Sequence, residues 1–378
     1  LLKLGKLIKE LPPFRAVEEA ISSFVASLPL ISSLKNEALR PRHWEALMKS
    51  TGITFDVNPT TFTLSRLFEM RLDQHEHEIH DIVSGAIKEL NIENGIAAIA
   101  DTWRVQRFEV AKYFKGGQER GLILRSPDAI LQTLEDQAMN LSSMASSRFV
   151  KPFVEQTTKW ERIMSTISEV IELWMKVQAK WMYLEAIFIG ADDIRLQLPE
   201  EAKRFDRVHG EFKKIMSETS KNSNVLDACT LEGRLAGLET IVAELESCQK
   251  SLSDYLETKR AAFPRFYFLS DDELLQILGT SDPTAAQEHM LKLFDNTSAL
   301  SFDSNAGKVL GAASPERESF TFCTPQSTEG AVESWLAQVE VEMATTLRAL
   351  MKEGVFVYPK SDRVEWLKET LGMVVNTA

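Results

Sequence analysis

Apolar residues recur at steps of three and four over the stretch 155–188, which is the spacing of one face of an α-helix. Trp160, Trp174 and Trp181 lie on or near this stripe, and each has a large apolar area to bury. At about 1.5 Å per residue, such a helix would be roughly 50 Å long. We therefore predict a long helix that packs against its neighbours along most of its length, and not a cofactor site.

Helical periods also occupy most of the remaining chain. Pro12, Pro13 and Pro29 are expected to break residues 1–35 into two short pieces, because proline removes a helix donor. A helix of about three turns is predicted to begin at Pro41. The other predicted helical segments are 59–72, 75–112, 127–144, 200–216, 231–262, 271–278, 332–351 and one that carries Trp366.

Two corners are predicted between these helices. Gly190 ends the long helix, and Pro199 begins the next one with two acidic residues in its first turn, where they favour the helix dipole. Pro264 ends a later helix, since proline cannot continue it. Ser270 and Glu273 then have the spacing of a capping box, which predicts the start of a further helix.

Alternation of apolar and polar residues replaces the helical period in two places. Residues 108–124, interrupted by GGQERG, predict a β-hairpin. Residues 308–324 predict a second hairpin, in which the polar SPERES joins two short β-like runs. Ser126 is expected to cap the helix that follows the first hairpin, with Pro127 at its first position.

Composition indicates a folded protein with two or three core-forming units. The chain has 378 residues, of which 44% are hydrophobic and 26% charged. The formal net charge of −12, without a basic stripe, argues against binding to nucleic acid or to anionic membranes. An uninterrupted apolar run of about 18 residues does not occur, so no membrane span is predicted. The chain begins at Leu1 and not at methionine, which suggests a portion of a longer protein.

Two motifs come close to known binding sites but lack a required residue. QHEHEIH contains His75, His77 and His80, yet it lacks the four-residue histidine spacing of HExxH, so we interpret it as a solvated helix face. GGQERGLI places Gly116 and Gly121 at the interval of a phosphate loop. The lysine and hydroxyl residue that would hold phosphate and magnesium are replaced by leucine and isoleucine.

The remaining reactive residues favour structural roles. Three isolated histidines are expected to be ordinary and partly exposed: His43, His209 and His289. Two acidic pairs stand at helix starts, where capping is expected: Asp192–Asp193 and Asp271–Asp272. The cysteines are far apart and lack a CxxC motif, which fits a reducing compartment: Cys229, Cys248 and Cys323. We therefore predict no catalytic residue, no cofactor and no metal in this chain.

Four blocks of the sequence resemble dynein heavy chains, in the linker region that precedes the first AAA+ module. The blocks are LRPRHWEALM at 39–48, SRFVKPFVEQTTKWE at 147–161, WMKVQAKWMYLEAIFIGADDIRLQLPEEAKRFDRVH at 174–209 and YLETKRAAFPRFYFLSDDELLQIL at 255–278. They cover nearly the whole chain in the right order, and FPRFYF and WMYLE are the most specific. Residues 147–161 look more like axonemal than cytoplasmic heavy chains.

The pattern and the resemblance together predict a mainly α fold, an elongated multi-helix bundle rod with one or two small β-hairpins. The resemblance implies a mechanical element that docks on the AAA+ ring, bends and straightens with its ATP cycle, and so gives the power stroke of microtubule-based ciliary movement. The implied partners are the AAA+ ring of the same heavy chain and, through the adjacent tail, dynein light or intermediate chains. The implied location is the cytoplasm and cytoskeleton, at the ciliary or flagellar axoneme.

Three portions of the linker are predicted. Residues 1–145 form an N-terminal portion, 146–262 a central bundle of long helices, and 263–378 a C-terminal portion that leads towards the ring. Because the phosphate loop, sensor residues and stalk of a complete motor are absent from the sequence, the chain alone is expected not to hydrolyse ATP.

The turn around FPRFYF is the candidate surface for ring docking, because it combines polar reach with a sharp, aromatic-rich turn. The candidate docking residues are Arg265, Tyr267, Asp271 and Asp272. The candidate hinge residues are Gly190, Pro199 and Pro264. The alternative for the turn is that its phenylalanines belong to the core and its charges cap a helix.

A free-standing helical scaffold or tethering protein, similar to spectrin, is the alternative function. The predicted hairpins count against a pure helical repeat, so they discriminate between the two. An enzyme built around His75, His77 and His80 is a third possibility, which metal analysis of the purified protein would test.

Overall fold

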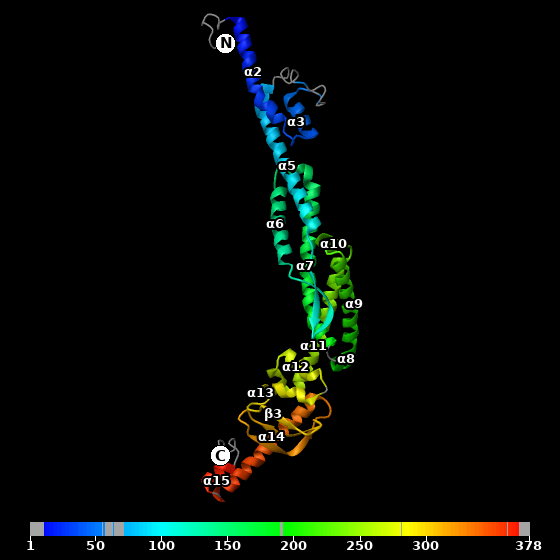
Figure 1. Ribbon diagram of the computed structural model, residues 1–378, viewed down its shortest axis with the longest axis vertical. Coiled ribbons are helices and arrows are strands. Elements are labelled where there is room, and N and C mark those ends of the chain that lie inside the picture. The colour runs from blue at the N-terminus through cyan, green and yellow to red at the C-terminus, as the bar shows by residue number, and fades with distance from the viewer. Residues whose placement is uncertain are drawn as a thin grey trace. The chain divides into compact units, whose positions relative to one another are not determined.

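The computed structural model describes residues 11–54, 56, 63, 72–189, 192–280, 282–360 and 362–369. Within these residues the fold is mainly α-helical, with one two-stranded and one three-stranded antiparallel sheet (Figure 1). The predicted fold class is confirmed in its helical content and in its small β elements. The chain divides into two compact units, the first made of 1–109, 126–169 and 223–231 and the second of 110–125, 170–222 and 232–378. The division into three linker portions stays a prediction.

The first unit is helical in its described residues. Its elements are α2 (Pro12–Leu34), α3 (Pro41–Thr51), η1 (Leu72–His75), α5 (Glu76–Val105), α6 (Asp128–Ala145), η2 (Lys151–Phe153), the first part of α7 (Val154–Phe188) and α10 (Val225–Thr230). The predicted helical segment 59–72 falls largely outside the described residues.

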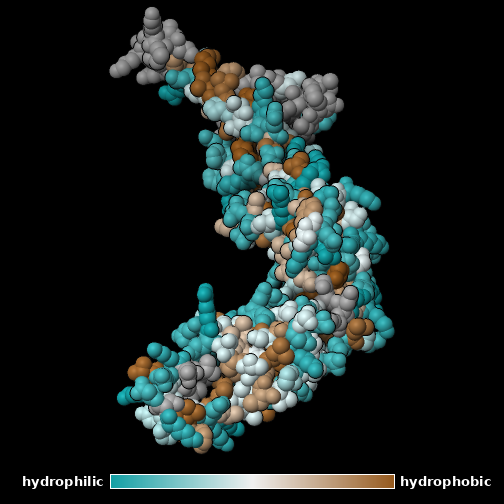
Figure 2. All heavy atoms as spheres, turned by 60° about the horizontal axis from the view of Figure 1, so that its bottom comes forward, coloured by the Kyte–Doolittle hydropathy of each residue, from teal (hydrophilic) through white to brown (hydrophobic). Residues whose placement is uncertain are grey.

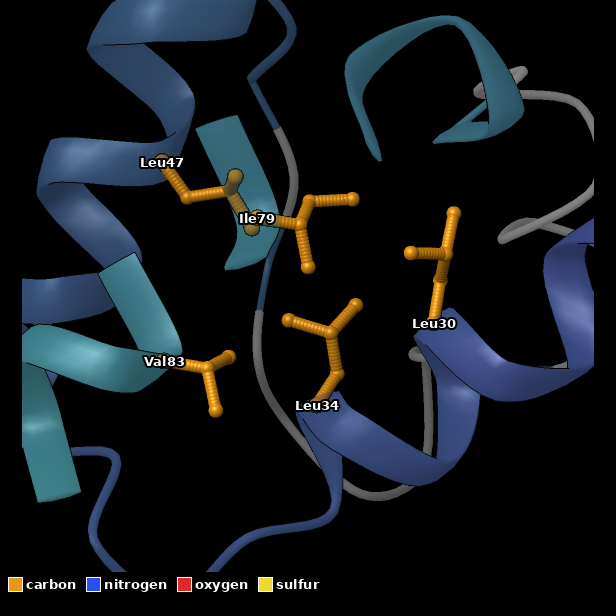
Figure 3. Packing of buried hydrophobic residues seen from close by; sticks show 5 residues of the cluster. All are labelled: Leu30, Leu34, Leu47, Ile79 and Val83. Carbon is orange, nitrogen blue, oxygen red and sulfur yellow. The ribbon is translucent and has the colours of Figure 1, made fainter. Parts of the chain in front are cut away.

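One core of the first unit lies where α2, α3 and α5 meet. Leu30, Leu34, Leu47, Ile79 and Val83 point toward one another in Figure 3, and each is less than one-tenth exposed. Burying an aliphatic side chain contributes about 1.5–3 kcal/mol relative to leaving it in water. The predicted three-turn helix beginning at Pro41 is therefore confirmed, and its apolar face holds it on α5.

The predicted break at Pro29 is wrong, because α2 continues through it without interruption. A proline inside a helix removes a single N–H and frees the carbonyl four residues earlier. That carbonyl belongs to Val25, which lies on an exposed turn where water can bind it. Pro12 occupies the first turn of α2, where a missing donor costs little.

The end of α5 is fixed by a residue distant in sequence. Asn224 Nδ2 donates to the carbonyl oxygens of Trp103, Arg104 and Gln106 at 3.1, 2.9 and 3.3 Å. The last carbonyls of a helix have no partner within it, so this buried amide replaces the missing bonds. The helical period predicted over 75–112 accordingly stops at Val105.

Ser126 does not cap α6 as predicted. Pro127 is the N-cap residue of α6, and the Ser126 hydroxyl donates to Asp128 Oδ2 at 2.5 Å. Because Ser126 lies one residue before the N-cap, its hydroxyl oxygen is not at the position that accepts from the first N–H groups of the helix.

The second unit combines helices with both sheets. Its elements are β1 (Val110–Lys115), β2 (Gln118–Leu124), the rest of α7, α8 (Asp192–Gln197), α9 (Pro199–Lys221), α11 (Arg234–Ala262), η3 (Pro264–Phe268), α12 (Asp271–Leu278), η4 (Pro283–His289), α13 (Met290–Leu293), β3 (Ala299–Phe302), β4 (Lys308–Ala313), β5 (Ser319–Ser327), α14 (Val332–Val357), η5 (Tyr358–Lys360) and α15 (Arg363–Glu369).

The long helix predicted over 155–188 is confirmed as α7, which has 35 residues. Trp174 and Trp181 are fully buried, while Trp160 is half-buried. α9 runs alongside α7 in Figure 1, and the rings of Trp181 and Phe212 lie 4.8 Å apart between them. The stripe is therefore packed core, as its tryptophans predict.

Both predicted hairpins form, and the second gains an extra strand. β1 and β2 pair antiparallel around Gly116 and Gly117, both of which have positive φ. β4 and β5 pair at the second site, and β3 adds to β4 to give the order β3-β4-β5. The four residues of β3 are too few to show an alternation of their own in the sequence. At Gly311 a Cβ atom would lie 2.2 Å from the Phe320 carbonyl oxygen, so this close approach requires glycine.

Helix side chains bind the backbone of both sheets. Leu124 N–H donates to Gln178 Oε1 at 2.7 Å, and Gln178 Nε2 donates to Leu124 O at 2.9 Å. On α14, Glu342 Oε1 accepts from Thr324 N–H and from the Thr346 hydroxyl, both at 3.0 Å. The N–H of Cys323 donates in turn to that hydroxyl oxygen at 3.1 Å.

Candidate functional site

The turn between α11 and α12 directs aromatic rings both into the protein and out of it. Phe263 and Phe266 are fully buried, with ring centroids 5.0 Å apart in an edge-to-face arrangement. Tyr267 and Phe268 are 58% and 68% exposed. Pro264 starts η3 directly after α11, so the chain reverses within a few residues. The turn therefore has a core half, as the alternative reading expects, and an exposed aromatic half. We call Tyr267 and Phe268 the aromatic pair.

Arg265 holds the turn against α13 and α14. Its Nε donates to Glu340 Oε1 at 3.0 Å, and its Nη1 donates to the Leu293 carbonyl oxygen at 2.8 Å. The guanidinium carbon also lies 4.9 Å from the centre of the Phe294 ring. These internal partners give Arg265 a structural role in positioning the aromatic pair.

The base of the turn is an ion-pair network around Arg260. This side chain is 11% exposed and donates to Asp271 Oδ1 at 2.7 Å and to Glu257 Oε1 at 2.9 Å. The Tyr267 hydroxyl donates a hydrogen bond to Glu257 Oε2, the other carboxylate oxygen, at 3.2 Å. The negative charge of Glu257 raises the pKa of Tyr267 above its ordinary value. One carboxylate oxygen of Asp271 is thus bound within the fold, and the hydroxyl of Tyr267 is oriented by its hydrogen bond to Glu257.

The predicted capping box at the start of α12 is confirmed. Ser270 N–H donates to Glu273 Oε2 at 3.0 Å, and Glu273 N–H donates back to the Ser270 hydroxyl. Glu273 also receives a hydrogen bond from Lys292 on α13. Mainly because of this lysine, the pKa of Glu273 is lowered to about 2. The box therefore joins α12 to α13 as well as starting the helix.

Both members of the acidic pair are exposed, and Asp271 is the one that is paired with Arg260. Burial raises the pKa of Tyr183 on α7, and the charges of Asp272 and Asp271 raise it further. Asp272 therefore adds negative potential beside Tyr183, at the exposed end of the turn that carries the aromatic pair. That surface favours a partner with apolar area and positive charge.

A polar cleft of about 420 Å³ lies in the second unit beside the ends of α8, α11, α12 and α14. A mostly buried ion pair between Lys259 and Glu333 crosses it, with side chains 18% and 12% exposed. Its other lining residues include Gln197, Tyr255, Asp282 and Trp335. The cleft lies between the end of α11 and the start of α14. The end of α11 directly precedes the turn at Pro264.

Two of the three candidate hinge residues lie at element starts. Pro199 is at the first position of α9, after Leu198, and Pro264 is at the first position of η3. Gly190 lies outside the described residues. The sequence gives no sign of α8, which occupies most of the predicted corner between Gly190 and Pro199.

The histidines differ from expectation at two positions. His43 and His289 are buried and not partly exposed, while His209 is half-buried. His43 can be buried because Arg40 N–H donates to its Nδ1 at 2.9 Å and its Nε2 lies 3.0 Å from Glu89 Oε2. In the QHEHEIH motif, the His77 side chain is 88% exposed. Among the described residues, no group of three or more His, Cys, Asp or Glu is placed to hold a metal.

Sequence reasoning missed Arg260 and Glu257 at the turn, and the alternative that places Phe268 in the core with Phe263 and Phe266 is wrong for Phe268, which is 68% exposed. Arg260 and its partner Asp271 are eleven residues apart on two different helices, so no helical spacing relates them. Phe268 belongs to the recognisable FPRFYF block, and its exposure distinguishes it from Phe263 and Phe266 only in three dimensions.

The described residues form a mainly helical region. The side chains described at its turn take part in packing, in ion pairs and in an exposed aromatic surface. Residues 1–354 match the family described as dynein heavy chain, N-terminal region 2. The chain is 55% identical over 99% of its length to the Dynein-1-alpha heavy chain of the flagellar inner arm I1 complex of Chlamydomonas reinhardtii. It is 48% identical over its whole length to human Dynein axonemal heavy chain 10. This chain belongs to the dynein heavy chain family, and the resemblance to axonemal members is confirmed. It spans 8% of the length of either relative.

Proposed function

We propose that this chain is the linker of an axonemal dynein motor, which docks on the AAA+ ring of its own heavy chain and changes its bend during the ATP cycle. Family membership supports this reading over a free-standing scaffold. The implied location is the ciliary or flagellar axoneme, after the flagellar and axonemal names of the relatives. Light or intermediate chains would be bound through other parts of the heavy chain.

The aromatic pair is the observation that supports docking most directly. Two large rings, 58% and 68% exposed, extend from a turn that Arg265 binds to α13 and α14, and the Tyr267 hydroxyl is also bonded to Glu257 of the network around Arg260. Exposed aromatic residues on a fixed turn are typical anchors of protein interfaces. Asp272 adds a charge for a basic patch on the ring, so the proposed docking surface consists of Tyr267, Phe268 and Asp272.

Substitution of the aromatic pair in the intact motor tests this surface. In the variant Tyr267→Ala with Phe268→Ala, we expect microtubule gliding to slow several-fold while ATP turnover continues, because docking and not chemistry is lost. Met139→Ala is the matched control, since Met139 is 73% exposed on α6. Unchanged gliding in the double variant would remove this turn from the docking surface. Arg265→Ala is a less specific test, because it also removes contacts to α13 and α14.

ATP turnover tests whether the chain is non-catalytic. We expect no turnover by the 378-residue chain, and turnover by a chain extended through its AAA+ modules. Turnover by the 378 residues alone would overturn the proposal that this region acts only mechanically.

A further inference from the structure

The cleft of the second unit carries more negative than positive charge. Its charged lining side chains are three carboxylates and one ammonium group: Asp282, Glu329, Glu333 and Lys259. Lys259 and Glu333 pair with each other, so the charges that remain are those of Asp282 and Glu329, both of which are exposed. Neither of these two forms an ion pair within the described part of the chain. The cleft therefore presents uncompensated negative charge to solvent.

The backbone around the cleft adds to this negative potential. Leu278, the last residue of α12, lines the cleft, and the last carbonyls of a helix carry partial negative charge. Thr284 N–H donates to Asp282 Oδ1 at 2.9 Å, and this bond lowers the pKa of the Asp282 carboxyl. The start of α14 also borders the cleft, but Glu333 in its first turn offsets the positive end of that helix. The surroundings thus favour a cation.

An organic cation fits the cleft better than a metal ion does. Among the described residues, no group of three or more His, Cys, Asp or Glu is placed to hold a metal. The volume of about 420 Å³ lies within the ~300–1,000 Å³ of pockets that hold small organic ligands, so a whole side chain can enter. Arginine and lysine carry their charge on an apolar stem, and the apolar residues Pro283 and Val332 also line the cleft.

We propose that the cleft binds an arginine or lysine side chain from a part of the heavy chain outside residues 1–378. Exposed ion pairs are weak, so they would not hold a separate protein by themselves. A segment tethered in the same chain compensates through its high effective concentration. The matched region is 8% of each relative, so most of such a heavy chain lies outside it.

This contact is separate from the proposed docking surface, because Tyr267, Phe268 and Asp272 do not line the cleft. Hydrophilic residues cover most of the face of the protein shown in Figure 2, and hydrophobic residues form smaller groups between them. Such a surface favours several local contacts, some of them charged, over one large apolar interface. The cleft supplies a charged contact of this kind.

Photo-crosslinking in the intact heavy chain tests the proposal. We would place p-benzoylphenylalanine at Gln197 or at Ala331, two exposed lining positions on different elements. Isotopically labelled and unlabelled heavy chains would be mixed, and the linked peptides identified by mass spectrometry. We expect both probes to link to one segment of the same chain that lies outside residues 1–378 and contains arginine or lysine.

The same probe at Met139, which is 73% exposed on α6, is the control and should not link to that segment. Links from the cleft probes to a second heavy chain, to another subunit or within residues 1–378 would overturn the proposal. A linked segment without arginine or lysine, or no link at all, would overturn it as well.

Removal of the two exposed charges tests the chemistry of binding. In Asp282→Asn with Glu329→Gln, the crosslink from Ala331 should fall by about fivefold or more, because the carboxylates that hold the cation are lost. The fold should persist, since the asparagine oxygen can still accept from Thr284 N–H and Glu329 is exposed.

The matched control is Glu135→Gln with Glu316→Gln, which removes two exposed carboxylates that do not line the cleft. We expect the crosslink to be unchanged in this control. An unchanged crosslink in the Asp282 and Glu329 variant, or an equal fall in the control, would overturn the proposal. The gliding test of Tyr267 and Phe268 is independent of this crosslink, so either can fail alone.

Discussion

Each of the two small sheets is bound to a helix by a buried polar side chain that hydrogen-bonds to the sheet backbone, but the side chain is an amide in one case and a carboxylate in the other. The β1–β2 hairpin is bound to α7 by the amide of Gln178, which donates one hydrogen bond to Leu124 and accepts another from it. The β3–β5 sheet is bound to α14 by the carboxylate of Glu342, which accepts from Thr324, Thr346 and Gln326. Both side chains are less than one-tenth exposed.

The backbone groups that face each helix determine which side chain is required. Leu124 presents both an N–H and a carbonyl, so its partner must donate and accept, which an amide does. β5 has a register shift between its pairs with Val309 and Gly311, which turns the N–H groups of Cys323 and Thr324 toward α14. Only donors reach Glu342 among its described contacts, so an acceptor-only carboxylate fits. Buried polar residues are therefore specific to the groups they bind and not interchangeable.

Exchange of the hairpin amide for a carboxylate should have the largest effect. In Gln178→Glu, a buried carboxylate would face the Leu124 carbonyl oxygen and lose the bond donated to it, so we expect unfolding free energy to fall by about 3 kcal/mol at pH 7. At pH 5 the loss should be smaller, because a protonated carboxyl can donate again. Urea unfolding of both chains at both pH values measures this. Gln132→Glu on the exposed face of α6 is the control, and an equal loss there would contradict the comparison.

The reverse exchange on α14 should cost less. In Glu342→Gln, the amide oxygen can still accept from Thr324 and Thr346, so we expect a loss of about 1 kcal/mol. Glu342→Leu leaves those donors without their acceptor and should cost about 2–3 kcal/mol. Urea unfolding measures both variants. An equal loss of unfolding free energy in Glu342→Gln and Gln178→Glu would contradict the comparison. It would mean that α14 requires the charge of Glu342, and not merely an acceptor for the groups that donate to it.

A third carboxylate sharpens the comparison with a small, pH-dependent effect. Glu273 is paired with the cation Lys292, and its pKa is lowered from 4.5 to about 2. Because the pKa is lower in the folded state, the stability it contributes is complete above about pH 4.5 and is lost as the pH falls toward 2. We expect Glu273→Gln to weaken the pH dependence of urea unfolding in this window. A stability difference between the two chains that stays constant from pH 6 to pH 2 would refute the assignment.

The sequence predicts a helix well where apolar residues recur at helical spacing along its whole length. α7 has a continuous apolar stripe, and the Ser270–Glu273 box needs residues only three positions apart, so both are readable from sequence. Pro29 shows the limit of local rules, because an exposed turn tolerates a missing donor that a buried one would not.

Features that depend on distant residues are not readable in this way. Asn224 lies some 120 residues after the helix end that it binds, and neither segment carries a pattern that points to the other. At the candidate docking turn, the sequence identifies the aromatic block and its charges. It does not separate the buried Phe266 from the exposed Phe268, because the direction of each ring depends on contacts in the folded chain, such as that between the rings of Phe266 and Phe263.

The shifted strand β5 also provides a natural attachment point for spectroscopic probes. Cys323 is exposed on this strand, whereas Cys229 and Cys248 are buried, and burial raises the pKa of the Cys248 thiol. An accessible thiolate attacks thiol-reactive dyes, which are electrophiles, so such dyes would label Cys323 first. A fluorophore at this position would stand beside the bond from Cys323 N–H to Thr346. Its emission would report movement of β5 relative to α14 without any engineered cysteine.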